Sequence, residues 1–212
     1  TTQIDLGWVR QGGPVRASVS AFYNRIDDFI LIQSNVSKPS GSMGTRQATV
    51  SRNVDAATWG GEVAAGTRLP GRFRVDASLA YTRGQNETES LPLAQIPPLE
   101  TRLGLVHEGE GWSAGVLLRG VARQDRFSLN QGNIVGQDLG ATPGSGLLSL
   151  HAAWTPAKGW LLSGGVDNLF NRTYAEHVSR TAGAIPGYAV QSLRVNEPGR
   201  TLWVKASLSF GR

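Results

Sequence analysis

Apolar and polar residues alternate along most of the chain. In the last such segment, residues 202–210, every second residue is apolar, and the positions between them include Lys205, Ser207 and Ser209. Alternation with a period of two indicates a β-strand with one apolar and one polar face. Similar runs predict about nine strands, near residues 2–10, 15–30, 47–69, 73–84, 99–108, 112–124, 146–156, 160–170 and 200–210. Helical periodicity never persists beyond about one turn, so the sequence predicts an all-β protein.

Short and long connections alternate between the predicted strands. Short connections rich in Gly and Pro, as tight turns require, lie at residues 11–14, 70–72, 108–111 and 156–159. Long connections lie at residues 31–46, 85–98, 125–145 and 171–199. In an antiparallel meander this puts every short turn at one end of the sheet and every long loop at the other. That layout is typical of an outer-membrane β-barrel, with short periplasmic turns and long extracellular loops.

Aromatic residues lie at two levels along the apolar positions. One set lies beside the short turns and comprises Trp8, Phe73, Trp112, Trp154 and Trp160, with Phe210 at the end of the last strand. A second set, Tyr23, Tyr81 and Phe170, lies further along the strands. Eight residues of a tilted strand rise about 20 Å, close to the ~25 Å apolar band between the aromatic girdles of membrane barrels. We therefore expect these aromatic residues to mark the two membrane interfaces.

Charged residues occupy the other face of the same strands. Within the expected band they are Arg16, Glu62, Arg68, Arg74, Asp76, Arg102, Arg119 and Lys205. A Lys or Arg facing lipid at mid-membrane costs about 2–4 kcal/mol, which explains this segregation. Arg10, Arg25 and Arg83 have the apolar parity but lie just past an aromatic residue, where lipid headgroups begin. A soluble β-sandwich also alternates, but it gives no reason for two aromatic levels or for long loops at one end only.

Composition agrees with an antiparallel transmembrane β-barrel and excludes several classes. A hydrophobic fraction of 40% and a charged fraction of 17% argue against disorder. The absence of cysteine excludes disulfides and thiol catalysis. The net charge of +5 comes from scattered residues, so nucleic-acid binding is not indicated. No segment reaches the ~18 consecutive apolar residues of a membrane helix, and the mean hydropathy of −0.20 is what alternating barrel strands give.

The strand count predicts an incomplete barrel. The first and last predicted strands run in the same direction, whereas bacterial barrels usually have an even number of strands and both termini in the periplasm. An open sheet in lipid would leave edge backbone groups unpaired, at a cost of several kcal/mol each. We therefore expect residues 1–210 to form the C-terminal part of a longer barrel and residues 211–212 to form a short tail.

Several segments carry a family resemblance. "GGVDNLFNRTYAEHVSR" at residues 164–180 and "NEPGRTLWVKASLSF" at residues 196–210 resemble the end of a TonB-dependent outer-membrane receptor. "NVDAATWGGE" at residues 53–62 resembles a mid-barrel strand of that family. "PLAQIPPLETRLGL", "NQGNIVGQDLG" and "YAEHVSR" further resemble its copper-receptor branch.

The resemblance implies a 22-strand barrel filled by an N-terminal plug, of which this chain would supply strands 14 to 22. It implies a place in the bacterial outer membrane and three protein partners. These are the plug with the first barrel strands, both absent from this sequence, the TonB complex, which binds a box near the N-terminus, and the barrel assembly machinery. That machinery recognises the closing strand, with Leu202, Val204, Leu208 and Phe210. The family usually ends at the aromatic residue, so Gly211 and Arg212 depart from its pattern.

No motif indicates catalysis, so we predict no enzyme and no cofactor. His107, His151 and His177 lie in separate segments, and metallohydrolase, serine-hydrolase and P-loop motifs are absent. Thioether and imidazole groups are the suitable protein ligands for copper. Met43 and His177, in two different long loops, are the weak candidates. One Met and one His do not form a selective site, so we predict no metal site in this chain.

These observations predict the function class. The first hypothesis is a TonB-dependent receptor that imports a scarce nutrient, with copper as the cargo. The second is the same kind of receptor for a ferric siderophore or another cargo. A soluble β-sheet binding module and an outer-membrane barrel enzyme are the remaining alternatives.

Overall fold

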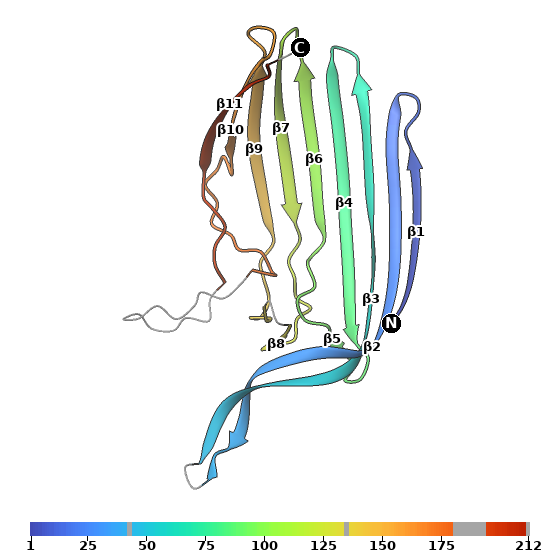
Figure 1. The fold of residues 1–212 in the computed structure, drawn as a ribbon, viewed down its shortest axis with the longest axis vertical. Coiled ribbons are helices and arrows are strands. Elements are labelled where there is room, and N and C mark those ends of the chain that lie inside the picture. The colour runs from blue at the N-terminus through green and yellow to red at the C-terminus, as the bar shows by residue number, and fades with distance from the viewer. Residues whose placement is uncertain (42–43, 134–135, 180–193, 211–212) are drawn as a thin grey trace, which may run out of the picture.

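The computed structural model describes residues 1–41, 44–133, 136–179 and 194–210. Within these residues eleven strands form one sheet, and nine of them follow one another in space in sequence order (Figure 1). These are β1 (Thr2–Arg10), β2 (Val15–Pro39), β3 (Thr45–Leu69), β4 (Phe73–Asn86), β6 (Glu100–Glu108), β7 (Trp112–Val121), β9 (Ser145–Trp154), β10 (Trp160–Asp167) and β11 (Thr201–Leu208). The other two are short: β5 (Leu91–Pro92) pairs with β4, and β8 (Gln131–Gly132) pairs with β2. No helix in the described part is long and apolar enough to cross a membrane.

The sheet is an open antiparallel meander. Every neighbouring pair along it is antiparallel. The short turns lie together at one end and the long connections at the other, and Thr1 and the C-terminal end of the chain lie at opposite ends (Figure 1). Among the described residues, β1 and β11 each have a neighbour on one side only. All nine predicted strands and the antiparallel topology are therefore confirmed.

The prediction of a loop at residues 31–46 is wrong. β2 and β3 continue as a two-stranded hairpin as far as Pro39 and Thr45, beyond the long-loop end of the other strands (Figure 1). The pairing shifts register between Ile26 and Phe29 and again between Gln33 and Val36. Asp28 and Asn35 lie at these shifts with φ of 58° and 59°, a conformation that Asp and Asn tolerate better than most residues. Each shift changes the parity of the following residues, which hides the alternation that identifies a strand.

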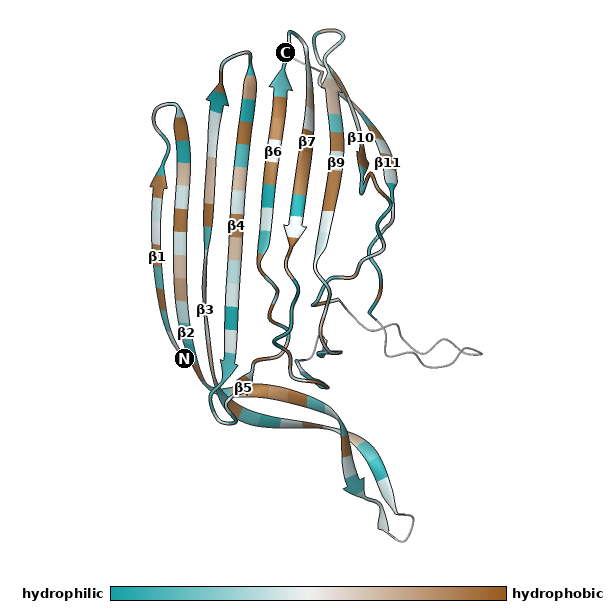
Figure 2. Cartoon of the chain, turned by 180° about the vertical axis from the view of Figure 1, so that it is seen from behind, coloured by the Kyte–Doolittle hydropathy of each residue, from teal (hydrophilic) through white to brown (hydrophobic). Residues whose placement is uncertain are grey.

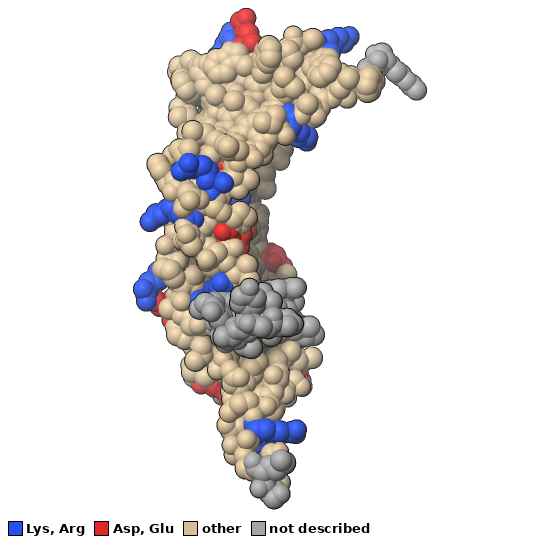
Figure 3. Space-filling view, turned by 90° about the vertical axis from the view of Figure 1, so that its left-hand side faces the viewer, with Lys and Arg blue, Asp and Glu red and all other residues tan. Residues whose placement is uncertain are grey.

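The register gathers apolar side chains on one face of the sheet. Val19 pairs with Val63 and Val63 with Leu79, and the row continues through equivalent positions of the later strands. We call this the apolar face; Figure 2 shows the hydrophobic bands that it leaves along the strands. Arg16, Asp76 and Arg102 have the opposite parity and belong to the polar face. Figure 3 shows a mostly uncharged surface with Lys and Arg in separate small patches.

Within the described residues, the apolar face has no hydrophobic core beneath it. The buried apolar residues of the described part are Leu31, Val54, Ala56, Ala57, Leu93 and Ala94, all at the long-loop end. By contrast, Val63 is 47% exposed, Tyr81 41% and Trp112 46%. A soluble sandwich would bury these side chains between its sheets. The arrangement instead resembles a barrel wall, whose apolar side chains point outward.

Gly60 is required by the close approach of β3 and β4. A Cβ added there would collide with the carbonyl oxygen of Tyr81 and lie 3.0 Å from the Cα of Thr82. Replacing Gly60 with Ala should therefore lower the free energy of unfolding by about 1–3 kcal/mol, because the sheet must shift to make room. Gly104→Ala is the matched control, since its nearest neighbour would lie 3.8 Å away. Equal urea midpoints for the two variants would contradict this account.

Candidate functional site

The polar face carries two rows of ion pairs that run across the strands. Near the short turns, Arg16 Nη2 lies 3.2 Å from Asp76 Oδ1, and Arg74 lies 3.0 Å from Asp76 and 2.9 Å from Glu108. These pairs join β2, β4 and the end of β6. Because the side chains are partly exposed, the pairs contribute little to stability. They make this face suitable for contact with water or with another polar surface.

The second row lies nearer the long loops. Glu100 accepts from Arg102 and Arg119, each at 2.6 Å. Arg119 also donates to Glu176 at 2.7 Å, in the connection that follows β10. The row therefore ties a long loop to the polar face of β6 and β7. Between the two rows lies an open hollow of about 850 Å³, lined by residues of both rows and by His151.

A buried polar cluster joins three long connections. Asp138 is fully buried, and its carboxylate accepts from the backbone N–H of Ser128 at 2.9 Å and of Gln95 at 3.0 Å. The Gln95 amide adds a third hydrogen bond at 3.1 Å. His177 Nε2 lies 3.4 Å from the same carboxylate. Gln95 precedes β6, Asp138 precedes β9 and His177 follows β10, so this single carboxylate fixes three loops relative to one another.

Thr142 and Arg194 complete this loop cluster, which we define as Gln95, Ser128, Asp138, Thr142, His177 and Arg194. Thr142 Oγ1 lies 2.8 Å from His177 Nδ1. Arg194 donates to the carbonyl oxygens of Gly140 at 2.5 Å and of His177 at 3.3 Å. Burial lowers the pKa of Arg194. Its guanidinium thus links the connection that follows β10 to the connection that precedes β9.

The pKa of Asp138 determines the pH range over which its carboxylate stabilises the loop cluster. Burial by itself would raise this pKa, but the contact with the His177 ring and the hydrogen bonds from Ser128 and Gln95 outweigh burial and lower it below the usual value. A carboxyl with a lowered folded-state pKa contributes stability above its unfolded pKa of about 3.9 and loses that contribution as pH falls through the folded value. The difference in loop protection between the wild type and Asp138→Asn should therefore be constant above about pH 5 and shrink below about pH 4. Hydrogen exchange measures this difference, and one that grows on acidification would contradict the assignment.

The projecting hairpin is held by a separate ion pair. Arg52 of β3 binds both oxygens of Glu89, with Nη2 2.8 Å from Oε2, and also donates to Gln33 of β2 at 3.1 Å. Asn86 donates to Glu89 at 2.9 Å. The hydrogen bond from Arg52 is the main cause that lowers the pKa of Glu89. The hairpin is therefore tied to the connection between β4 and β5 as well as to β8.

The structure describes one of the two weak metal candidates. Met43 lies outside the described residues. His177 is described and is only 1% exposed, with its two ring nitrogens facing Thr142 and Asp138. No group of three or more His, Cys, Asp or Glu residues in the described ranges could hold a metal ion. His107 and His151 lie on opposite faces of the sheet, His107 with the apolar residues and His151 with the polar ones.

The aromatic residues expected at the membrane interfaces all lie exposed. They are Trp8, Tyr23, Phe73, Tyr81, Trp112, Trp154, Trp160 and Phe170. Trp112 and Trp154 are direct cross-strand partners. Sequence reasoning missed His107, which lies between Phe73 and Trp112 with ring-centre distances of 4.8 and 5.1 Å. His107 shares its parity with Leu103 and Leu105, and this parity was the sequence signal that could have placed it on the apolar face. The interface role of these residues stays a prediction.

The closing strand presents a free edge. β11 pairs with β10 from Thr201 to Leu208, so Phe210 lies beyond the strand. Leu202, Val204 and Phe210 are strongly exposed, and Leu208 is less so. Gly211 and Arg212 lie outside the described residues. Their part in assembly stays a prediction.

Comparisons with known proteins agree with the geometry. The family described as "TonB dependent receptor-like, beta-barrel" matches residues 1–169. The solved structure of the copper transporter OprC is 41% identical, with a TM-score of 0.88, over 98% of this chain and 30% of that chain. The FrpB iron transporter from Neisseria meningitidis is 16% identical (TM-score 0.67; 97% of this chain, 30% of that chain). A mutant of the ferric enterobactin receptor PfeA from Pseudomonas aeruginosa is 17% identical (TM-score 0.70; 98% of this chain, 31% of that chain).

The two iron-related structures show a common fold, since their identities are low. This chain spans about 30% of the length of each of these three structures. A comparison with curated proteins gave no match.

Proposed function

Because this chain belongs to the TonB-dependent receptor family of outer-membrane β-barrels, we propose that it forms the C-terminal part of the barrel of a receptor that imports copper. The apolar face is the lipid-facing side of the wall, and the polar face lines the interior. The long connections and the projecting hairpin lie on the extracellular side. The observation that carries the cargo proposal is the 41% identity to a copper transporter over 98% of this chain.

The partners of the chain follow from this role. The free edges of β1 and β11 pair with barrel strands encoded upstream, which closes the wall and satisfies the edge backbone groups. The two rows of ion pairs on the polar face contact a plug domain, also encoded upstream. The TonB complex acts through the N-terminal region, and the assembly machinery recognises β11 together with Phe210. The chain acts in transport and not as an enzyme.

The loops of this chain shape the extracellular mouth of the receptor. The buried Asp138 carboxylate and the Arg52–Glu89 pair fix the connections at the long-loop end. These contacts hold the mouth in one arrangement without offering a donor set for copper among the described residues. We therefore place the copper ligands in the upstream part of the receptor.

Copper accumulation tests the proposal. The full-length receptor would be produced in cells that lack their own copper receptor, and cell-associated copper would be measured with and without an intact TonB complex. Accumulation that requires both the receptor and TonB is expected. TonB-dependent uptake of a ferric siderophore without copper uptake would support the alternative cargo and overturn copper. Replacing Met43 with Leu, with His177→Gln as a companion, would test the two weak candidates; unchanged copper uptake in both variants would remove them as ligands.

A further inference from the structure

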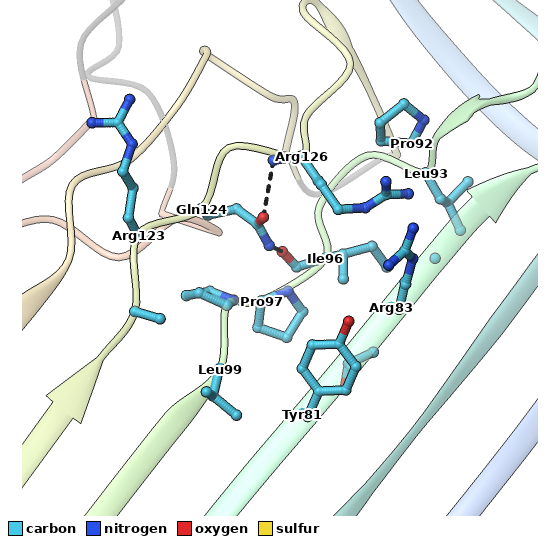
Figure 4. A pocket seen from close by; sticks show the side chains of 14 residues that line it. Tyr81, Arg83, Pro92, Leu93, Ile96, Pro97, Leu99, Arg123, Gln124 and Arg126 are labelled. Atoms are coloured by element: carbon cyan, nitrogen blue, oxygen red, sulfur yellow. Dashed lines mark hydrogen bonds between the residues drawn. The ribbon is translucent and has the colours of Figure 1, made fainter.

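Two arginines share a small pocket at the extracellular end of the apolar face. The pocket has a volume of about 120 Å³, and its lining includes Tyr81, Arg83, Leu93, Ile96, Leu99 and Arg126. Arg83 comes from β4, whereas Arg126 comes from the connection that follows β7. Figure 4 shows their side chains reaching toward one another between Ile96 and Leu93. The pocket therefore depends on contacts between strands and a loop, not on one segment.

Each arginine is held in place by uncharged groups. Arg83 lies over the ring of Trp59, 5.8 Å from its centre, as in a cation–π contact. Arg126 donates from Nη2 to Gln85 Oε1 at 3.1 Å, and its backbone N–H donates to Gln124 Oε1 at 3.1 Å. Gln124 in turn donates to the carbonyl oxygen of Ile96 at 3.1 Å. The two guanidinium groups are thus positioned before any ligand arrives.

Neither guanidinium is neutralised by a carboxylate. No ion pair of Arg83 or Arg126 occurs within the described ranges, and the remaining residues include no Asp or Glu. Arg83 Nε is also buried without a hydrogen-bond partner. Buried donors are normally satisfied, and two neighbouring positive charges repel one another. An anionic group with several acceptor oxygens would accept the free hydrogen bond of Arg83 Nε and would neutralise the repulsion between the two guanidinium groups.

The position of the pocket selects the kind of anion. Tyr81 and Arg83 have the parity of Leu79, and Leu99 has the parity of Leu103, so these side chains belong to the apolar face. Arg83 lies two residues beyond Tyr81, on the long-loop side of the expected aromatic level. Leu93 and Ile96 close the pocket on the opposite face, where a Cβ added at Gly84 would lie 2.9 Å from Leu93 and 2.6 Å from Ile96. A ligand that reaches the two arginines along the apolar face therefore comes from the lipid phase. Phosphate is the headgroup anion that arginine binds with bidentate geometry.

We propose that Arg83 and Arg126 form a binding site for a phosphate of an outer-leaflet lipid headgroup. Trp59 and Tyr81 support the sugar or glycerol part beside it, and Leu99 contacts the upper acyl chain. The site rests on the outward orientation of the apolar face but is independent of the cargo. Lipid bound here would link β4 to the loop that follows β7 and would anchor the extracellular end of this part of the wall.

Lipid binding to the full-length receptor in detergent tests the site. The probes are lipid A with both phosphates, the same lipid after dephosphorylation, and inorganic phosphate, with binding followed by native mass spectrometry. Because the two guanidinium groups supply the charge-assisted hydrogen bonds to the phosphate, Arg83→Gln combined with Arg126→Gln should weaken lipid A binding by at least about tenfold. Arg72→Gln is the matched control, since Arg72 is an exposed arginine paired with Glu110 that lies at the short-turn end, outside the pocket.

The outcomes separate the possibilities. The wild type and Arg72→Gln are expected to bind phosphorylated lipid A equally well. Both are expected to bind the dephosphorylated lipid as weakly as the double variant binds phosphorylated lipid A. Equal binding of phosphorylated lipid A by the double variant and the wild type would overturn the proposal. Displacement of lipid A by an equal concentration of inorganic phosphate would indicate a soluble-anion site and would also overturn it. The comparison of the two lipids on the wild type keeps the test decisive if the double variant does not fold.

Discussion

Replacing Val63 with Arg is expected to lower the free energy of unfolding by about 2–4 kcal/mol, because the charge would face lipid near mid-membrane. Val63 lies on the apolar face of β3, between Val19 of β2 and Leu79 of β4. The aromatic residues expected at the two interfaces, Tyr81 and Phe73, pair with Gly61 and Leu69 of β3, so Val63 lies between the two aromatic levels. Folding of the full-length receptor into lipid vesicles under increasing urea measures the effect.

Ala64 provides the matched control for Val63. It is the next residue of the same strand, its partners are Ser18 and Ser78, and it lines the hollow on the polar face. Ala64→Arg should therefore cost far less than Val63→Arg, although both introduce the same charge. If the order were reversed, with Ala64→Arg the more damaging change, the orientation of the sheet in the membrane would be wrong.

The second large effect is expected at Asp138. Asp138→Ala would leave the buried N–H groups of Ser128 and Gln95 without an acceptor, at about 1–3 kcal/mol for each. We expect the loop cluster to open more easily by about 3 kcal/mol or more, while the strands stay folded. Hydrogen exchange at Ser128 and Gln95, compared with exchange in β6 and β7, measures this local opening.

Asp125 is the control for Asp138. It lies in the same connection and carries the same charge, but it is exposed and paired only with Arg123. Asp125→Ala should leave exchange at Ser128 and Gln95 unchanged. Faster exchange in both variants alike would show that general loss of negative charge, and not the buried hydrogen bonds, governs the loops.

The wall of the barrel could be predicted from local sequence. Turn residues at 11–14 and 70–72 and the strict alternation beside them predicted the short-turn ends of β1 to β4, because both signals act within a few residues. The family resemblance and the outer-membrane location are confirmed by the family match over residues 1–169. The orientation of Tyr81 and Trp112 also agrees with expectation, since parity alone decides the face of a strand.

The loops could not be predicted in the same way. The extension of β2 and β3 was missed because the shifts at Asp28 and Asn35 break the parity on which the prediction relied. The Asp138 cluster was missed because its contacts cross long separations, 43 residues to Gln95 and 39 to His177. Such contacts leave no periodic signal in the sequence. The pocket at Arg83 could be predicted only in part. The face on which Arg83 lies follows from its parity in β4, whereas the approach of Arg126 from a distant loop leaves no signal in the sequence.

Spin labels along β3 test most directly whether the apolar face meets lipid. The chain contains no cysteine, so single cysteines at Glu62, Val63, Ala64 and Ala65 of the reconstituted receptor can be labelled in turn. Labels at 63 and 65 are expected to collide mainly with lipid-soluble oxygen, whereas labels at 62 and 64 are not. Labels at 63 and 65 that are shielded from oxygen, or that collide mainly with a water-soluble nickel complex, would contradict the outward orientation of the apolar face.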